Sequence, residues 1–344
     1  MTIRDRRALK NSAKNALEYS AYSPRKLFGI HIAVTAGITL VLSVLTYCLD
    51  QGIAATGGLD GIGPRALLQT AQQLLQTLSS LATPFWQISL FFLSLQLFRR
   101  QTVDPSTLLT GFRRAGPVLR LFILKIVILF AVVMGSTYVT SILLSFSPLS
   151  DALSVLILSR LPAIEAVTAE EILVLLEDPV FLRQFLTAFL PMFILLLVVM
   201  FVCLMLILYR LRMTDFVLMD QPEKGARHAI KTSWRLTKGN CFSLFKLDLS
   251  FWWFYTLDLV LMALYMCGFL LLETAQPELM QLLFDLVFCI GQVALYTWAN
   301  AYVQTTYAAA YEVLLVQKRQ QEQETQRQTA QTQTPWGLPQ PPQI

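Results

Sequence analysis

The sequence has little charge, few histidines and no paired cysteines. Only 14% of its 344 residues are charged and 55% are hydrophobic, whereas about a quarter of the residues in soluble proteins are charged. An ordinary soluble composition is therefore excluded. The two histidines, His31 and His228, lie too far apart in the sequence for an HExxH zinc helix. The five cysteines stand singly, without a CxxC pair, so neither a disulfide framework nor a zinc site is predicted.

Catalytic motifs are also missing. The sequence contains no G-x-S-x-G elbow, no P-loop and no G-x-G-x-x-G fingerprint. Its apolar segments lack the paired acidic residues that metal-dependent lipid enzymes use. The pair Glu170 and Glu171 fits the solvated start of a helix better than a catalytic pair. We therefore expect a protein that is not an enzyme and uses no cofactor, and a lipid-modifying enzyme is the weakest of three functional hypotheses.

Long apolar segments are abundant. About twenty apolar residues in a helix cross a hydrocarbon core of about 30 Å, and six segments of the sequence meet this requirement. They lie at about 27–49, 81–98, 118–147, 187–209, 247–272 and 282–316. The fold class predicted from them is all-α, a polytopic membrane protein with six transmembrane helices.

Basic residues are distributed unevenly between the predicted loops. In the six-span arrangement, 24 of the 27 lysines and arginines fall on one side of the membrane. Short basic loops stay on the cytoplasmic side, so we expect both termini to lie in the cytoplasm. The net charge of +5 is spread over this face. The predicted partner is therefore the lipid bilayer with its anionic inner-leaflet lipids, and no nucleic acid.

Residues 222–238 are predicted to form a short amphipathic cytoplasmic helix, because Pro222 and Glu223 are typical of a helix start and Gly239 of a helix end. Five basic residues recur along one face of it: Lys224, Arg227, Lys231, Arg235 and Lys238. They are candidates for contact with anionic headgroups, worth about 1 kcal/mol each. The alternatives are a signal for orientation during insertion, a solvated face, or packing against the N-terminal helix.

Two other segments resemble this helix. Residues 13–20 share its alanine, basic, aliphatic and serine positions, and residues 105–116 are a poorer match. The chain can thus be divided into three units, each a short helix followed by a transmembrane hairpin. Chance similarity between short Ala/Lys-rich helices is the alternative.

The sixth predicted span carries a polar stripe at spacings of three and four residues. Its members are Asp285, Cys289, Gln292, Tyr296, Asn300, Gln304, Tyr307 and Tyr311. Unpaired polar groups are costly in hydrocarbon, so the stripe faces either other helices, as hydrogen-bonding glue, or a hydrated pathway. Asp258 lies near mid-membrane in the fifth span. We predict an intramembrane polar site of Asp258, Gln292, Tyr296, Asn300 and Gln304.

The segments outside the spans have distinct compositions. Residues 1–26 read as a basic cytoplasmic helix, and residues 64–81 and 168–177 as short helices on the outer side. Residues 317–344 are rich in Gln, Thr and Pro and have few apolar residues to bury. They are predicted to form a disordered cytoplasmic tail.

Three stretches, "AIKTSWRLTKGN", "LFKLDLSFWW" and "AYVQTTYAAAYEVLL", resemble a bacterial integral membrane family called domain of unknown function 975. Matches in the first two are Ala229, Ile230, Ser233, Leu236, Lys238, Gly239, Leu249, Ser250 and Phe251, and in the third Tyr302, Thr306, Ala308, Tyr311, Glu312 and Leu314. Thr237, Ala301 and Ala310 depart from the Met, Pro and Phe expected of the family. The resemblance implies a six-span plasma-membrane protein of bacterial type and no established activity.

The two stronger functional hypotheses are both non-enzymatic. The leading one is a non-enzymatic scaffold or adaptor whose amphipathic helices lie against the inner leaflet. The alternative is a transporter or permeability pathway for a small solute or lipid, built on Asp258 and the stripe. A packed stripe with every amide satisfied would favour the scaffold, and a hydrated cavity would favour transport.

Overall fold

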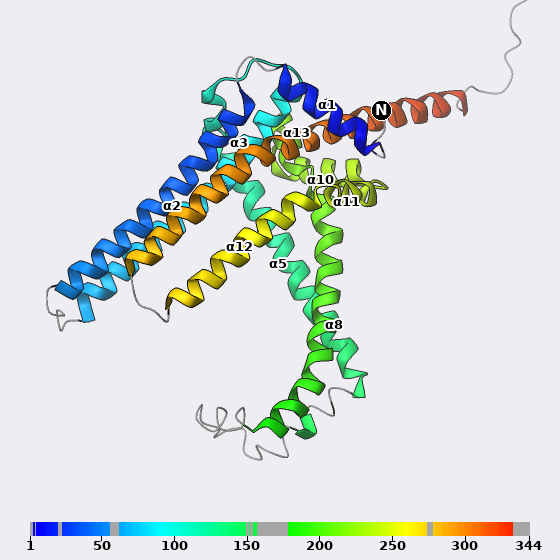
Figure 1. Ribbon diagram of the computed structural model, residues 1–344. Helices are drawn as coiled ribbons and strands as arrows, with labels where there is room; N and C mark the ends of the chain where they lie inside the picture. Colours follow the sequence, from blue (N-terminus) through cyan, green and yellow to red (C-terminus); the bar gives the residue numbers. More distant parts are fainter. Residues whose placement is uncertain are drawn as a thin grey trace, which may run out of the picture. The chain divides into compact units, whose positions relative to one another are not determined.

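The structure is a computed structural model that describes residues 3, 5–19, 23–55, 62–148, 151, 154–156, 178–273 and 278–332. The described residues form helices and contain no strand, so the all-α prediction is confirmed (Figure 1). The chain divides into two compact units. The central unit comprises Phe122–Leu211, and the terminal unit combines Met1–Leu121 with Arg212–Ile344.

The central unit contains most of α5 (Ala115–Ser145) and α8 (Pro179–Leu211). Both are apolar around their whole circumference, and the apolar window of the α8 segment has no buried residue. Along α8, Phe185 stacks on Phe189 with 5.3 Å between ring centroids, and Phe189 on Phe193 with 5.8 Å. A helix that is apolar all round without being covered by protein is typical of a membrane span.

Four described stretches are long and apolar enough to cross a membrane: Ser80–Phe98, Ala115–Ser145, Pro179–Asp220 and Leu283–Thr329. A fifth is formed if the bent pair Cys241–Leu249 and Trp252–Gly268 counts as one span. The predicted first span, 27–49, lies within α2 (Pro24–Ala55), but the side chains at 48–55 are outside the described residues. The count of six spans and the division into three repeats therefore stay predictions.

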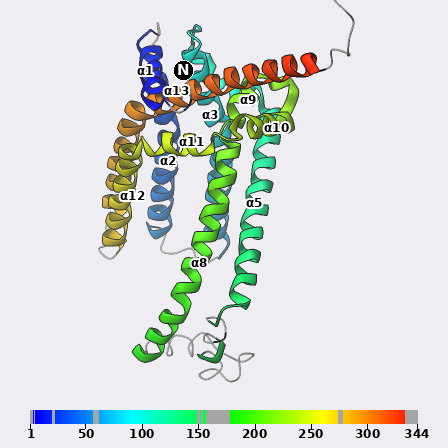
Figure 2. The same ribbon diagram turned by 90° about the vertical axis from the view of Figure 1, so that its right-hand side faces the viewer.

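Helix boundaries differ from the predictions in two spans. The outer helix 64–81 and the span 81–98 form one helix, α3 (Ile62–Phe98), which continues through Pro84. The span 247–272 is instead split between α11 (Cys241–Leu249) and α12 (Trp252–Glu273), which meet at 59°. Figure 2 shows α11 running across the direction of α12. At this bend the Ser250 hydroxyl donates to the Leu247 carbonyl at 2.6 Å, and Lys10 Nζ donates to the Ser250 carbonyl at 2.8 Å.

The C-terminal segment also differs from the prediction. The last helix, α13 (Glu278–Thr332), continues through residues 317–332, where composition predicted a disordered tail. This part is rich in Gln, Glu, Lys and Arg, which lose little side-chain freedom in a helix. The helix therefore needs no buried apolar face to continue there. Residues 333–344 and the predicted outer helix 168–177 lie outside the described residues.

The core of the terminal unit forms where α13 packs along α2 and α3. Gly29 allows close approach, since a Cβ at this position would lie 3.0 Å from Thr297 Cγ2 on α13. The buried cluster beside this contact consists of Leu27, Phe28, Leu90, Leu93, Leu97, Val103, Leu108 and Ala301. Val103 precedes the short helix η1 (Pro105–Leu109), and α4 (Thr110–Arg113) follows it. This apolar cluster sets the positions of α2, α3 and α13 relative to one another.

Short helices complete the terminal unit. The first is α1 (Arg6–Glu18), whose N-terminus is capped by Asp5 accepting from the Ala8 amide at 3.1 Å. It packs on α13. The others are α9 (Thr214–Asp220), η3 (Pro222–Lys224) and α10 (Gly225–Thr237). The helix predicted over 222–238 is thus broken at Gly225, whose φ of +76° lies in the left-handed region that favours glycine.

Candidate functional site

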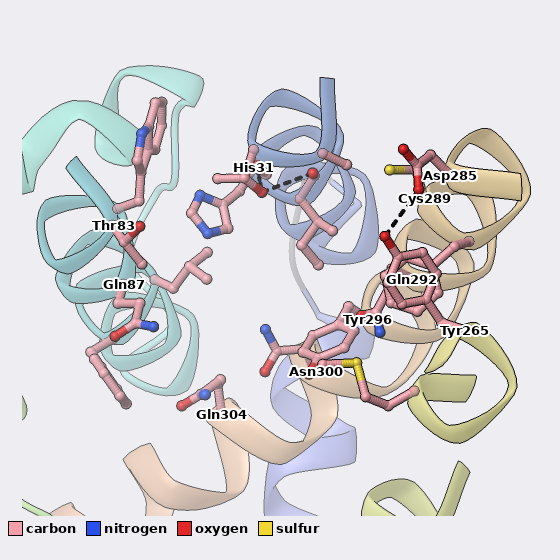
Figure 3. A pocket seen from close by; sticks show the side chains of 18 residues that line it. His31, Thr83, Gln87, Tyr265, Asp285, Cys289, Gln292, Tyr296, Asn300 and Gln304 are labelled. Carbon is pink, nitrogen blue, oxygen red and sulfur yellow. Dashed lines mark hydrogen bonds between the residues drawn. The ribbon is translucent and has the colours of Figure 1, made fainter. Parts of the chain in front are cut away.

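The helices α2, α3, α12 and α13 surround a cavity of about 610 Å³ (Figure 3). All of them belong to the terminal unit. Six of the eight stripe residues of α13 line this cavity: Asp285, Cys289, Gln292, Tyr296, Asn300 and Gln304. Because the spacing of three and four residues keeps them on one face of the helix, a single helix supplies a continuous polar wall.

Asp258 lies against this wall from α12. Its Oδ1 accepts a hydrogen bond from Gln292 Nε2 at 3.3 Å, and its Oδ2 accepts one from the Tyr296 hydroxyl at 3.2 Å. Of the other four residues predicted for the intramembrane site, two, Gln292 and Tyr296, are thus hydrogen-bonded to Asp258. Gln292, Tyr296, Asn300 and Gln304 all line the cavity, whereas Asp258 supports its wall. The carboxylate therefore positions the side chains that a ligand would meet.

The acidic side chain of the stripe, Asp285, is also held by α12. The Tyr265 hydroxyl donates to Asp285 Oδ1 at 3.0 Å. The ring of Tyr265 packs against Phe288, with 4.3 Å between the ring centroids. Both aromatic residues and Asp285 line the cavity, so this part of the wall combines a carboxylate with aromatic faces.

The opposite wall comes from α2 and α3. His31 is 6% exposed, and its ring centroid lies 5.3 Å from that of Trp86. Among the described residues, neither His31 Nδ1 nor Gln304 Oε1 has a hydrogen-bond partner. Figure 3 shows both side chains and Asn300 around the same open space. A buried polar atom without a partner costs about 1–3 kcal/mol, so the cavity offers unused hydrogen-bonding capacity to an occupant.

The other end of the stripe is packed against protein. Tyr307 and Tyr311 are 2% and 1% exposed. The Tyr311 hydroxyl donates to Asp220 Oδ2 at 3.2 Å, and Arg99 bridges Asp220 and Glu312 with contacts of 2.6 Å each. The stripe therefore divides into a packed end that holds α3, α9 and α13 together and an end that lines a cavity.

The basic residues of α10 and of the positions next to its two ends form a separate surface, which we call the basic surface. It consists of Lys224, Arg227, Lys231, Arg235 and Lys238, all exposed. The opposite face buries Ala226, Ala229, Ser233 and Leu236, and α10 packs on α9 and α13. Protein rather than membrane thus covers this opposite face. The basic surface is free to meet either solvent or headgroups.

The charge of the basic surface affects His228, which lies in α10 beside it. The pKa of His228 is lowered from its ordinary value by burial first, and then by repulsion from Lys224, Arg235 and Lys231. Its Nε2 lies 3.4 Å from the Thr232 hydroxyl. A histidine in this position resists adding a further positive charge.

Sequence reasoning missed several residues of the site. His31 and Trp86 carry no polar periodicity and reach the cavity only because α2 and α3 pack on α13. Arg99 meets Glu312 across 213 positions of sequence, which no local pattern reveals. Tyr265 did have a signal, because it lies seven residues after Asp258 and therefore on the same helix face.

Comparisons with curated proteins and with solved structures find no match. A family model does match residues 1–318, nearly the whole chain. The residues that suggested this family in the sequence lie in α10 and α11, in the short connections that follow each of them, and in α13. The chain therefore belongs to the family described as protein of unknown function DUF975.

Proposed function

We propose that the protein is a membrane transporter or permeability pathway that binds a small solute in the cavity between α2, α3, α12 and α13. The observation that carries this proposal is that six residues of the polar stripe of α13 line about 610 Å³ of space. Three of them, Asp285, Gln292 and Tyr296, are also hydrogen-bonded to α12, but the space in front of them is not filled by a neighbouring helix. Ligand sites of proteins have volumes of about 300–1,000 Å³. A stripe that served only to bond helices together would not leave this space, which Gln304 lines.

Observations other than the cavity support a membrane location. Four described stretches and one bent helix pair are long and apolar enough to span, and 24 of the 27 basic residues segregate to one side of a six-span arrangement. We infer six spans in the plasma membrane of a bacterium, with both termini in the cytoplasm. The lack of catalytic motifs in the sequence supports a role that is not enzymatic.

Cysteine accessibility tests the proposal. In a chain whose native cysteines are replaced by serine, a cysteine at Asn300 should react with a small water-soluble methanethiosulfonate. A cysteine at Tyr307, on the packed end of the same helix, is the matched control and should stay unreactive because Tyr307 is 2% exposed. Equal and slow reaction at both positions would show that water does not reach the cavity and would contradict the proposal.

The scaffold hypothesis keeps one specific observation in its favour. All five residues of the basic surface are exposed. Three of them, Arg227, Lys231 and Arg235, lie in α10, whose other side is docked on protein, and Lys224 and Lys238 flank this helix. Such a surface fits anionic headgroups, with about 1 kcal/mol from each basic residue. Charges of this kind are also common on solvated helix faces, so the surface supports lipid contact only as the second candidate.

Lipid retention tests this second candidate. The full-length chain, purified from a membrane that contains phosphatidylglycerol, should retain that lipid in native mass spectra. Replacing the five residues of the basic surface with glutamine should remove the retained lipid. The control replaces the exposed Arg319 and Arg327 of α13 and should leave it bound. Equal retention in all three proteins would leave the basic surface as a topology signal.

A further inference from the structure

The chemistry of the cavity wall narrows the class of solute, on the assumption that the proposed function holds. The described lining includes one carboxylate, from Asp285, and no lysine or arginine. A second carboxylate, Asp258, lies directly behind the wall, hydrogen-bonded to Gln292 and Tyr296. A small anion placed here would meet negative charge without a compensating cation, whereas a cation would be attracted.

Aromatic faces add to this preference. Trp86 lines the cavity on the α3 side, and Tyr265, Phe288 and Tyr296 line it on the α12 and α13 side. The face of an aromatic ring is electronegative and attracts ammonium groups, more strongly where water is excluded. The same rings accommodate the apolar part of an amphipathic molecule.

The unpartnered atoms have matching chemistry. Gln304 Oε1 is a hydrogen-bond acceptor, and His31 Nδ1 accepts in the tautomer that carries its proton on Nε2. Both belong to the cavity lining, and His31 is 6% exposed. An occupant that donates hydrogen bonds satisfies Gln304 Oε1, and it satisfies His31 Nδ1 in that tautomer. An ammonium group supplies donors and positive charge together, while a carboxylate or phosphate supplies neither.

We propose that this cavity selects small organic cations, namely amines with an aromatic or aliphatic portion. Asp285 provides the charge, the aromatic side chains provide the cation-binding faces, and His31 and Gln304 accept hydrogen bonds from the ammonium group. The inference assigns a substrate class to the site of the proposed function and adds no chemical step.

Three probes of one shape and different charge test the inference: phenethylammonium, phenethyl alcohol and 3-phenylpropionate. Binding to the full-length chain in nanodiscs of zwitterionic phosphatidylcholine is measured by calorimetry. Protection of the cysteine at Asn300 from methanethiosulfonate locates the bound probe. The cation should bind at least tenfold more tightly than the anion, with the alcohol between them.

Two variants assign the charge preference to the cavity. Asp285→Asn keeps an oxygen that can accept from Tyr265 but removes the charge, so the ratio of cation to anion affinity should fall towards one. Asp104→Asn, at an exposed carboxylate that precedes η1, is the control and should leave the ratio unchanged. A ratio that survives Asp285→Asn overturns the inference.

The outcomes separate this inference from the proposed function. If the alcohol or the anion binds as tightly as the cation and protects position 300, the cavity is a small-molecule site without charge selection, and only the inference fails. If none of the probes binds or protects, both fail. The order of the affinities of the three probes for the unaltered chain tests the inference even if Asp285→Asn does not fold.

Discussion

Replacing Asp258 with alanine should weaken the contact between α12 and α13. The side chain accepts two hydrogen bonds, from Gln292 at 3.3 Å and from Tyr296 at 3.2 Å. Hydrogen bonds between membrane helices contribute about 0.6 kcal/mol on average and up to about 1.7. The loss of both should lower the free energy of unfolding by about 1–3 kcal/mol. The lower end of this range is expected because Gln292 and Tyr296 line the cavity and water can replace part of what is lost.

A double-mutant cycle isolates the Asp258 to Tyr296 bond from the other effects of truncation. Asp258→Ala, Tyr296→Phe and the combined variant are compared with the unaltered chain by reversible unfolding in mixed micelles. The two changes should be non-additive by about 0.6–1.7 kcal/mol, since the second removes a partner that is already lost. Asp258→Asn should cost less than Asp258→Ala because one acceptor oxygen remains.

The outcome that refutes this reasoning is additivity. If the combined variant equals the sum of the single ones to within about 0.3 kcal/mol, Asp258 and Tyr296 do not interact in the folded protein. The wall of the cavity would then be arranged differently. Asp104→Ala, at an exposed position away from α12, controls for the general effect of removing a carboxylate and should be close to neutral.

Three further outcomes are expected. Gly111→Ala should lower the free energy of unfolding by about 1–3 kcal/mol, because its Cβ would collide with the backbone of α3. Gly116→Ala should have little effect, since its Cβ would meet no atom within 4 Å beyond its chain neighbours and the backbone of its own helix. Equal melting temperatures of the two variants would contradict the Gly111 contact. Cysteines at Arg183 and Arg327 should label from opposite sides of the membrane, and labelling from one side would overturn the topology. His228 should titrate in NMR below the ordinary value of 6.5, and its pKa should rise with added salt as repulsion is screened. Since this pKa is lowered in the folded chain, the contribution of His228 to stability should fall as pH drops below about 6.5, and a pKa at or above that value would refute the assignment.

Local patterns were enough to predict much of the architecture. Runs of about twenty apolar residues determine where a helix can span, because backbone groups in hydrocarbon must pair within their own helix. The spacing of three and four residues placed Asp285 to Gln304 on one face, and the structure has them on one wall. The same periodicity placed the basic residues of α10 together. These features depend on residues close in sequence and on the geometry of a single helix.

Helix boundaries were predicted less well where they depend on tertiary contacts or on weak local preferences. The bend at Ser250 is held in part by Lys10, 240 positions away, and an apolar window gives no sign of it. The helix over 317–332 contradicts the compositional expectation of disorder, because residues with good helix propensity can extend a helix already started by a packed segment. Hydrophobicity alone predicts neither the bend at Ser250 nor the helix over 317–332.

Only the packing of the helices determines what the polar stripe faces. The sequence by itself determined that Asp285 to Tyr311 share a face and must avoid lipid. It left both interhelical hydrogen bonding and a pathway open, and it favoured interhelical hydrogen bonding. The tertiary structure divides the face. Arg99 and Asp220 cover the end of the stripe at Tyr311. At the end from Asp285 to Gln304, a cavity separates the stripe from His31 and Trp86. The physical reason is that helix periodicity specifies direction around one axis, whereas the distance to the next helix depends on side chains contributed by distant parts of the chain.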